Sequence, residues 1–174
     1  MLMKIVLVGY MGSGKSTLGP LLADSLGLSF IDLDHYIETQ IGLSIPEIFE
    51  QKGAVFFRKQ ERLALETLLL SKDHFVLATG GGAPCYGDNI TFMKSHSDQI
   101  IYVKLSVATL LARLRPSKQH RPLIAHLEGD ALEEFLRKHL FERAFYYNQS
   151  HLVVDMEDKD PSQSVAAILD QLKN

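Results

Sequence analysis

The residues best suited to chemistry form a glycine-rich loop near the start of the chain. Residues 9–16 read GYMGSGKS, which matches the pattern GxxxxGK[ST] and lies between an apolar run and a helical pattern. Glycines let the backbone curl around phosphates, and successive amide N–H groups with the positive end of the following helix attract anionic oxygens. Lys15 would reach the β- and γ-phosphates, and the Ser16 hydroxyl would ligate Mg²⁺. The loop predicts nucleotide binding, but kinases, GTPases, motors and nucleotide sensors share it.

Two carboxylates, Asp32 and Asp34, follow the second predicted strand. On an extended backbone their side chains project the same way, towards the carboxyl edge where ligands of open α/β sheets bind. One carboxylate could bind Mg²⁺ through water, while the other accepts a hydrogen bond from a hydroxyl and orients or deprotonates it. A solvated acidic turn, or a cap for a helix from Tyr36 onwards, is the alternative reading of this pair.

Three consecutive glycines, Gly80, Gly81 and Gly82, follow the third predicted strand. They let backbone N–H groups approach a ligand closely, whereas an ordinary strand-to-helix turn would need one glycine. Arg58 lies three residues before Glu61 in a helical pattern, so an ion pair can fix its guanidinium to grip a carboxylate in two places. Arg143 is a second candidate of this kind. Either arginine alone would also fit a surface ion pair.

A basic segment extends over residues 113–126, which read RLRPSKQHRPLIAH with no acidic residue. This pattern favours a mobile loop that closes on phosphates, with Arg121 as a charge stabiliser and Arg113 or Arg115 near the nucleotide base. A solvated basic loop is one alternative, and a minor nucleic-acid contact is another that the absence of interleaved aromatic residues disfavours. The expected nucleotide-binding residues are Gly12, Ser13, Gly14, Lys15, Ser16, Thr17 and Arg113.

The elements that must position these residues alternate along the chain. Short β-rich runs at 4–8, 28–33, 74–79, 99–105 and 151–155 predict five strands. Helical patterns cover 16–26, 45–70 with a break near Gly53, 107–114, 131–147 and 162–172. Ser44, Asp130 and Asp160 are the expected caps of the helices that follow them. The alternation predicts an α/β fold, a five-stranded parallel sheet with helices on both faces.

Composition excludes several classes of protein. A chain of 174 residues, 46% hydrophobic and 22% charged, fits one globular domain spanning 1–174. The net charge of -3 argues against a surface built for nucleic acid or an anionic membrane, and the apolar start is too short to span a bilayer. Cys85 is the single cysteine, which excludes an intramolecular disulfide and favours the cytoplasm. We expect neither a nucleic-acid nor a membrane partner.

Taken together, the motifs resemble those of the shikimate kinase family. The likeness covers nearly the whole chain: GYMGSGKS, FIDLD, FFRKQE, ATGGG, HRPLI and ERAFYY occur in that order. The resemblance implies a P-loop kinase fold of the nucleoside monophosphate kinase type. It also implies a cytoplasmic monomer that phosphorylates the 3-hydroxyl of shikimate with ATP and Mg²⁺, a step of aromatic amino-acid biosynthesis. Within the single domain, the substrate-binding region would be about 33–61 and the lid about 113–126.

The resemblance also implies residue roles. Asp34 would hold the attacking hydroxyl and Asp32 would act with Ser16 on Mg²⁺. Lys15 and Arg121 would stabilise the transferring phosphoryl group. Arg113 and the loop before Pro161 would flank adenine. Shikimate would be bound by Asp34, Arg58, Arg143 and the backbone of Gly80, Gly81 and Gly82.

This chain departs from the family pattern in two motifs. The usual Gly-Glu before the Phe-Arg element is Gly53-Ala54 here, so one supporting carboxylate is missing. The pattern Arg-x-Pro-x-Tyr becomes RAFYY from Arg143 onwards. The alternatives to a shikimate kinase are a related kinase acting on gluconate or a nucleoside monophosphate, and a nucleotide-binding regulatory module without turnover.

Overall fold

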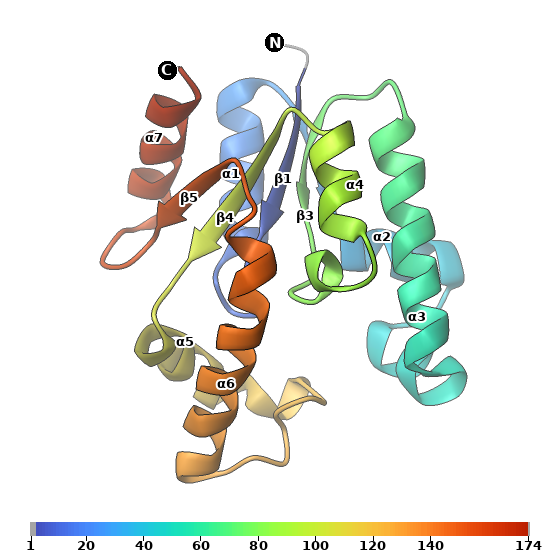
Figure 1. Ribbon diagram of the computed structural model, residues 1–174, viewed down its shortest axis with the longest axis vertical. Coiled ribbons are helices and arrows are strands. Elements are labelled where there is room, and N and C mark those ends of the chain that lie inside the picture. Colours follow the sequence, from blue (N-terminus) through green and yellow to red (C-terminus); the bar gives the residue numbers. More distant parts are fainter. Residues whose placement is uncertain (1–2, 174) are drawn as a thin grey trace.

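A parallel sheet forms the centre of the computed structural model, which describes residues 3–173 (Figure 1). In that part of the chain the strands are β1 (Lys4–Val8), β2 (Ser29–Asp32), β3 (Phe75–Ala78), β4 (Gln99–Lys104) and β5 (Leu152–Asp155), in the order β2-β3-β1-β4-β5. Four residues of the central strand, from Ile5 to Val8, are 0% exposed. Their burial explains the continuous apolar run that predicted this strand, because a central parallel strand is covered on both faces.

Helices cover both faces of the sheet. They are α1 (Lys15–Leu26), α2 (Leu33–Ile41), α3 (Ile45–Leu70), α4 (Asn89–His96), α5 (Val107–Leu114), α6 (Gly129–Tyr147) and α7 (Pro161–Leu172). Figure 1 shows α1 behind the strands, where it contacts β2, β3 and α7, and α4 in front, where it contacts β4. The predicted α/β fold with a five-stranded parallel sheet is confirmed.

Two of the three expected helix caps are confirmed. Ser44 and Asp160 each accept a hydrogen bond from the backbone N–H three residues on, within a complete capping box. The expectation for Asp130 is wrong, because α6 begins at Gly129 after Glu128, which forms no side-chain cap. Gly129 has a φ of 50°, which lets the chain enter the helix earlier and leaves Asp130 inside the first turn.

The predicted break in the long helical pattern is also confirmed, since Gly53 has non-helical angles (φ 83°, ψ 169°) inside α3. Two helices, α2 and α4, were not among the predicted ones. Both are short, with nine and eight residues, and neither has a strong apolar stripe in the sequence. Across residues 3–173, no helix is both long and apolar enough to cross a membrane.

Candidate active site

The glycine-rich loop leaves the central strand β1 and leads directly into α1. Gly12 (φ 80°) and Gly14 (φ 99°) take left-handed backbone conformations that favour glycine, and Gly14 is the N-cap of α1. Lys15 is 8% exposed, and its Nζ donates to the carbonyl oxygens of Gly9 at 2.7 Å and Tyr10 at 3.0 Å. Burial lowers the pKa of Lys15 to about 8, although Asp34 and Asp32 oppose the shift.

Most of the expected site residues line one cavity of about 390 Å³. From the loop and α1 come Gly12, Gly14, Lys15, Ser16 and Thr17, and from the neighbouring strand ends come Asp32, Asp34, Gly80 and Gly81. Arg113 and Arg121 line the same cavity. An adjoining cavity of about 240 Å³ is lined by Ser13 and Arg113 together with Met156, Lys159 and Pro161. The structure therefore brings Arg113 beside the segment before Pro161, as the resemblance implied.

The geometry predicted for the two carboxylates needs correction. Asp32 ends β2, but Asp34 lies in the first turn of α2, so the two side chains do not share one extended strand. Asp32 caps this helix through Oδ1, which accepts from the His35 N–H at 3.1 Å. Its Oδ2 accepts from the Ser16 hydroxyl at 2.9 Å. The alternative reading, in which the carboxylate caps a helix, is therefore correct for Asp32, although the helix begins at Leu33 rather than Tyr36. The same carboxylate also contacts Ser16 of the phosphate loop.

Asp34 is a partly buried carboxylate, and its Oδ1 is fully buried. Among the residues that the structure describes, its Oδ1 finds no hydrogen-bond donor. Burial chiefly raises the pKa of Asp34 to about 6, with Asp32 adding to the shift and Lys15 opposing it. A Cβ on Gly80 would come within 3.1 Å of that oxygen, so the glycine keeps the space beside it free. A carboxylate with this pKa can accept a proton near neutral pH.

Arg58 and Arg143 converge on Gly82. A Cβ at this position would lie 2.7 Å from Nη2 of Arg58 and 3.2 Å from Nη2 of Arg143, although the backbone angle of Gly82 is ordinary (φ −88°). The predicted pair of Arg58 with Glu61 is present, with Nη1 and Oε1 2.7 Å apart. Burial raises the pKa of Glu61, and Arg58 opposes that shift. Two guanidinium groups beside a bare backbone position form a site for an anion.

The basic segment contains more structure than an open loop. It begins at the end of α5 and forms a short 3₁₀ helix (Arg115–His120), and Ile124 is 0% exposed. Lys118 donates to the Leu127 carbonyl at 2.7 Å and pairs with Glu128. These contacts close the segment into a compact turn that carries Arg121 to the cavity.

Other polar contacts of the site were not predicted from the sequence. The hydroxyl of Tyr147 donates to the Gly81 carbonyl at 2.6 Å, so α6 supports the glycine triplet. The hydroxyl of Tyr10 lies 2.8 Å from Nδ1 of His139, which joins the phosphate loop to the same helix. Burial lowers the pKa of His139 to about 4, which keeps this imidazole neutral near pH 7. The YY pair after Arg143 was the available signal for Tyr147.

A parallel α/β sheet with a phosphate loop after its central strand places the chain among the P-loop proteins. The partly buried Asp34 beside that loop has the chemistry that a P-loop kinase requires, since a carboxylate there can receive a hydroxyl proton.

Comparison with known proteins identifies the family. The family model described as shikimate kinase matches residues 11–173. A shikimate kinase of Flavobacterium psychrophilum is 46% identical over 165 residues, 95% of this chain and 96% of that protein. The crystal structure of shikimate kinase from Bacteroides thetaiotaomicron has a TM-score of 0.91 at 35% identity, covering 100% of both chains. Shikimate kinase from Acinetobacter baumannii, solved in complex with shikimate, has a TM-score of 0.88 at 36% identity, covering 99% of this chain and 93% of that one. This chain belongs to the shikimate kinase family, as the motifs predicted.

Proposed function

We propose that this chain transfers the γ-phosphoryl group of ATP to the 3-hydroxyl of shikimate, giving shikimate 3-phosphate and ADP. The reaction is a step of aromatic amino-acid biosynthesis. Beyond family membership, the proposal rests on one observation: Asp34, whose Oδ1 has no donor among the described residues, lines the same cavity as the phosphate loop. Its carboxylate is where an acceptor hydroxyl can donate its hydrogen.

The donor half of the reaction belongs to the phosphate loop. Its amides and the start of α1 bind the β- and γ-phosphates, and Lys15 leaves its carbonyl partners to contact them. Arg121 stabilises the charge on the transferring group, and adenine enters the adjoining cavity between Arg113 and the segment before Pro161.

Mg²⁺ fits the oxygen atoms beside the loop. The Ser16 hydroxyl and Asp32 carboxylate lie 2.9 Å apart, and Mg²⁺ in kinases typically takes one or two protein oxygens together with phosphate and water. When bound, the ion neutralises negative charge on the β- and γ-phosphates. Ser16 and Asp32 are the residues that would hold it.

The acceptor half is built around Asp34. The 3-hydroxyl donates to the Asp34 carboxylate, its oxygen bonds to the γ-phosphorus as the bond to the ADP oxygen breaks, and the proton passes to Asp34. Arg58 and Arg143 bind the acceptor carboxylate near Gly82, while the backbone of Gly80, Gly81 and Gly82 approaches its hydroxyls. Loss of the family's glutamate at Ala54 leaves Glu61 as the buried carboxylate that orients Arg58.

Within one domain, the region 33–61 contributes Asp34 and Arg58 to the acceptor site, and residues 113–126 act as a lid that brings Arg121 onto the phosphates. Closure of such a lid excludes water from the reacting groups.

A coupled assay of ADP release tests the function. The purified chain is supplied with Mg²⁺ and ATP, and shikimate is compared with gluconate, a panel of nucleoside monophosphates and no acceptor. We expect strong stimulation by shikimate alone. Asp34→Asn, purified in parallel, controls for a contaminating kinase. Stimulation by another acceptor, or none in the presence of bound ATP, would refute the assignment.

A further inference from the structure

A tyrosine ring covers the guanidinium of Arg58. The Cζ of Arg58 lies 3.8 Å from the centroid of Tyr86, and a second ring, Phe57, lies at 5.1 Å. Tyr86 immediately follows the short 3₁₀ helix (Ala83–Cys85) after the glycine triplet, and its side chain is 47% exposed. A large aromatic side chain that is half exposed at this place stacks on an arginine instead of entering the core.

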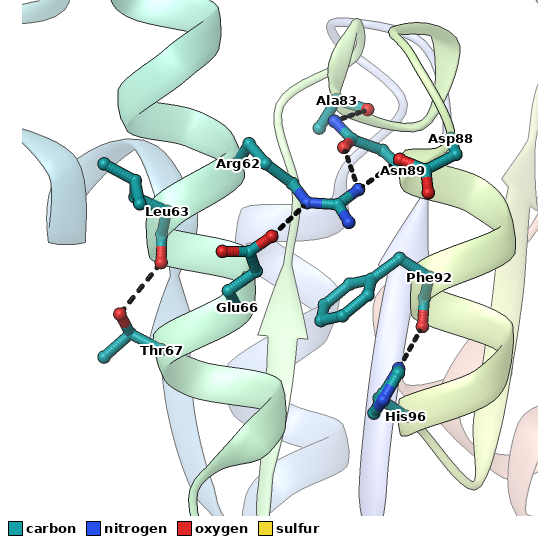
Figure 2. A network of polar contacts seen from close by, with 9 residues as sticks. All are labelled: Arg62, Leu63, Glu66, Thr67, Ala83, Asp88, Asn89, Phe92 and His96. Atoms are coloured by element: carbon teal, nitrogen blue, oxygen red, sulfur yellow. Dashed lines mark hydrogen bonds and ion pairs between the residues drawn. The ribbon is translucent and has the colours of Figure 1, made fainter.

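The segment that carries Tyr86 is anchored to α3 one turn beyond Arg58. Figure 2 shows Arg62 reaching from α3 to Asp88 at 2.6 Å and to Asn89 at 3.0 Å, while its Nε donates to Glu66. The amide of Asn89 donates to the Ala83 carbonyl at 2.9 Å. Both sides of Tyr86 are therefore held, at Ala83 and at Asp88 with Asn89, by contacts that do not involve its own side chain.

Three contacts together leave Arg58 little freedom. Glu61 accepts from Nη1 at 2.7 Å, Nη2 lies beside the backbone of Gly82, and the ring of Tyr86 covers one face of the plane. The Arg58 side chain is still 22% exposed, so without the ring its guanidinium can turn towards solvent. A planar guanidinium with one face stacked keeps its free edge directed at an anion.

We propose that Tyr86 is a positioning residue for acceptor recognition, which holds the guanidinium of Arg58 against Gly82 in the orientation that receives the carboxylate of the acceptor. The inference rests on the proposed function for the identity of that acceptor. It adds a residue from the segment after the glycine triplet to the site. Tyr86 acts through Arg58 and takes no part in phosphoryl transfer.

The first test is steady-state kinetics of Tyr86→Leu and Tyr86→Phe. Leucine keeps an apolar side chain without a ring, so KM for shikimate should rise about 5- to 30-fold, the range of a partly desolvated cation–π contact. The kcat and the KM for ATP should stay within about twofold of wild type. A contact with the carboxylate of the acceptor stabilises the bound acceptor and the transition state equally, so its loss raises KM and leaves kcat unchanged. Phenylalanine keeps the ring and should restore the KM for shikimate.

Phe92→Leu is the matched control. It removes an aromatic ring from another arginine of α3, since the Cζ of Arg62 lies 4.3 Å from the centroid of Phe92. Its KM for shikimate should change by less than about twofold, because Arg62 keeps its bonds to Glu66, Asp88 and Asn89 without the ring, so the segment that carries Tyr86 stays anchored. An unchanged KM in Tyr86→Leu, or an equal rise in Phe92→Leu, would overturn the proposal.

A second readout separates this inference from the proposed function. Nitrogen-15 NMR of the arginine side chains, with Arg58 assigned through Arg58→Lys, reports rotation of the guanidinium without any substrate. Separate Nη1 and Nη2 signals in wild type that merge in Tyr86→Leu, but not in Phe92→Leu, support positioning even if shikimate is not the acceptor. If the signals are already merged in a wild-type protein that phosphorylates shikimate, the role of Tyr86 is refuted and the proposed function still stands.

Discussion

Nη1 of Arg58 and Oε1 of Glu61 are 2.7 Å apart, and the carboxylate is nearly inaccessible at 1% exposure while the arginine is 22% exposed. The burial of one partner means that the pair is not an ordinary surface ion pair. Removing the charge of Glu61 would leave Arg58 without its orienting carboxylate, beside Gly82, where we propose that the carboxylate of the acceptor binds. The relationship therefore links folding stability to acceptor binding.

Glu61→Gln should lower the free energy of unfolding by about 1–3 kcal/mol. Burial disfavours the charge of Glu61, but removing that charge weakens the charge-assisted hydrogen bond and leaves Arg58 without its counter-charge, which costs more. KM for shikimate should rise with little change in KM for ATP. The matched control is Glu66→Gln on the same helix, where the carboxylate that pairs with Arg62 is 39% exposed. That variant should lose less than about 1 kcal/mol in urea unfolding. Equal losses in the two variants would contradict the special role of Glu61.

The raised pKa of Asp34 predicts an acid limb in the rate profile. The base must be ionised, so kcat/KM for shikimate should fall as pH decreases through about 6. Glu38→Gln removes a negative charge that contributes to the raised pKa and should move the inflection to lower pH. A profile that stays flat from about pH 8 to 5 would remove Asp34 as the proton acceptor.

The same shift predicts that the ionised carboxylate of Asp34 costs stability. The pKa of Asp34 is raised from 3.8 to about 6 on folding, so its favourable contribution is complete below 3.8 and is lost as pH rises through about 6. Asp34→Asn should therefore gain stability relative to wild type between pH 4 and 8, by up to about 3 kcal/mol. Urea unfolding of both proteins at the two pH values measures the difference. The variant should bind ATP without turnover, and a pH-independent difference in stability would show that the carboxylate is not destabilised by burial.

Arg121 should carry a large part of the transition-state stabilisation. Arginines that contact a transferring phosphoryl group are worth about 10³–10⁵ in rate, so Arg121→Ala should lose roughly 4–7 kcal/mol in kcat/KM. Arg137→Ala provides the control, because that side chain is 67% exposed on α6 and pairs with Glu133. Its rate should match wild type. A loss below about tenfold in Arg121→Ala would exclude the assigned role.

The lid should respond to substrates. Residues 113–126 are expected to exchange backbone hydrogens readily in the free protein and to become protected when a non-hydrolysable ATP analogue and shikimate bind together. Hydrogen exchange followed by mass spectrometry measures this, with the buried strand β1 as an internal reference. Protection unchanged by both ligands would argue against closure.

Local patterns in the sequence predicted the parts of the site whose geometry is itself local. The phosphate loop is defined by its glycines and lysine within eight residues, and the Arg58–Glu61 pair lies within one helical turn. The strands were recognisable because a buried parallel sheet needs continuous apolar runs. The two missed helices, α2 and α4, are short and lack the strong apolar stripe that identified the equally short α5, although Asp32 and Gly42 flank α2 as cap residues.

Contacts between distant segments left no such pattern. Tyr147 and Gly81 are 66 residues apart, and Tyr10 and His139 are 129 apart. The stacking of Tyr86 on Arg58 depends on how α3 packs against the segment after β3, which no local periodicity encodes. The placement of Asp34 inside a helix was also missed. Asp32 is both the last residue of β2 and the N-cap of α2, so no loop residues separate the strand from the helix.

The bond between Tyr10 and His139 has a mechanical consequence. The bond connects the phosphate loop to α6. Because α6 also carries Arg143, a shift of the loop should be accompanied by a shift of this helix. Burial raises the pKa of Tyr10 to about 12 and lowers that of His139 to about 4, so both rings are uncharged over most of the pH scale. Dissolved ions screen the attraction between charged groups, but they have little effect on a hydrogen bond between two neutral groups. The contact between Tyr10 and His139, and with it the relative position of the phosphate loop and α6, should therefore be insensitive to salt and to moderate changes in pH.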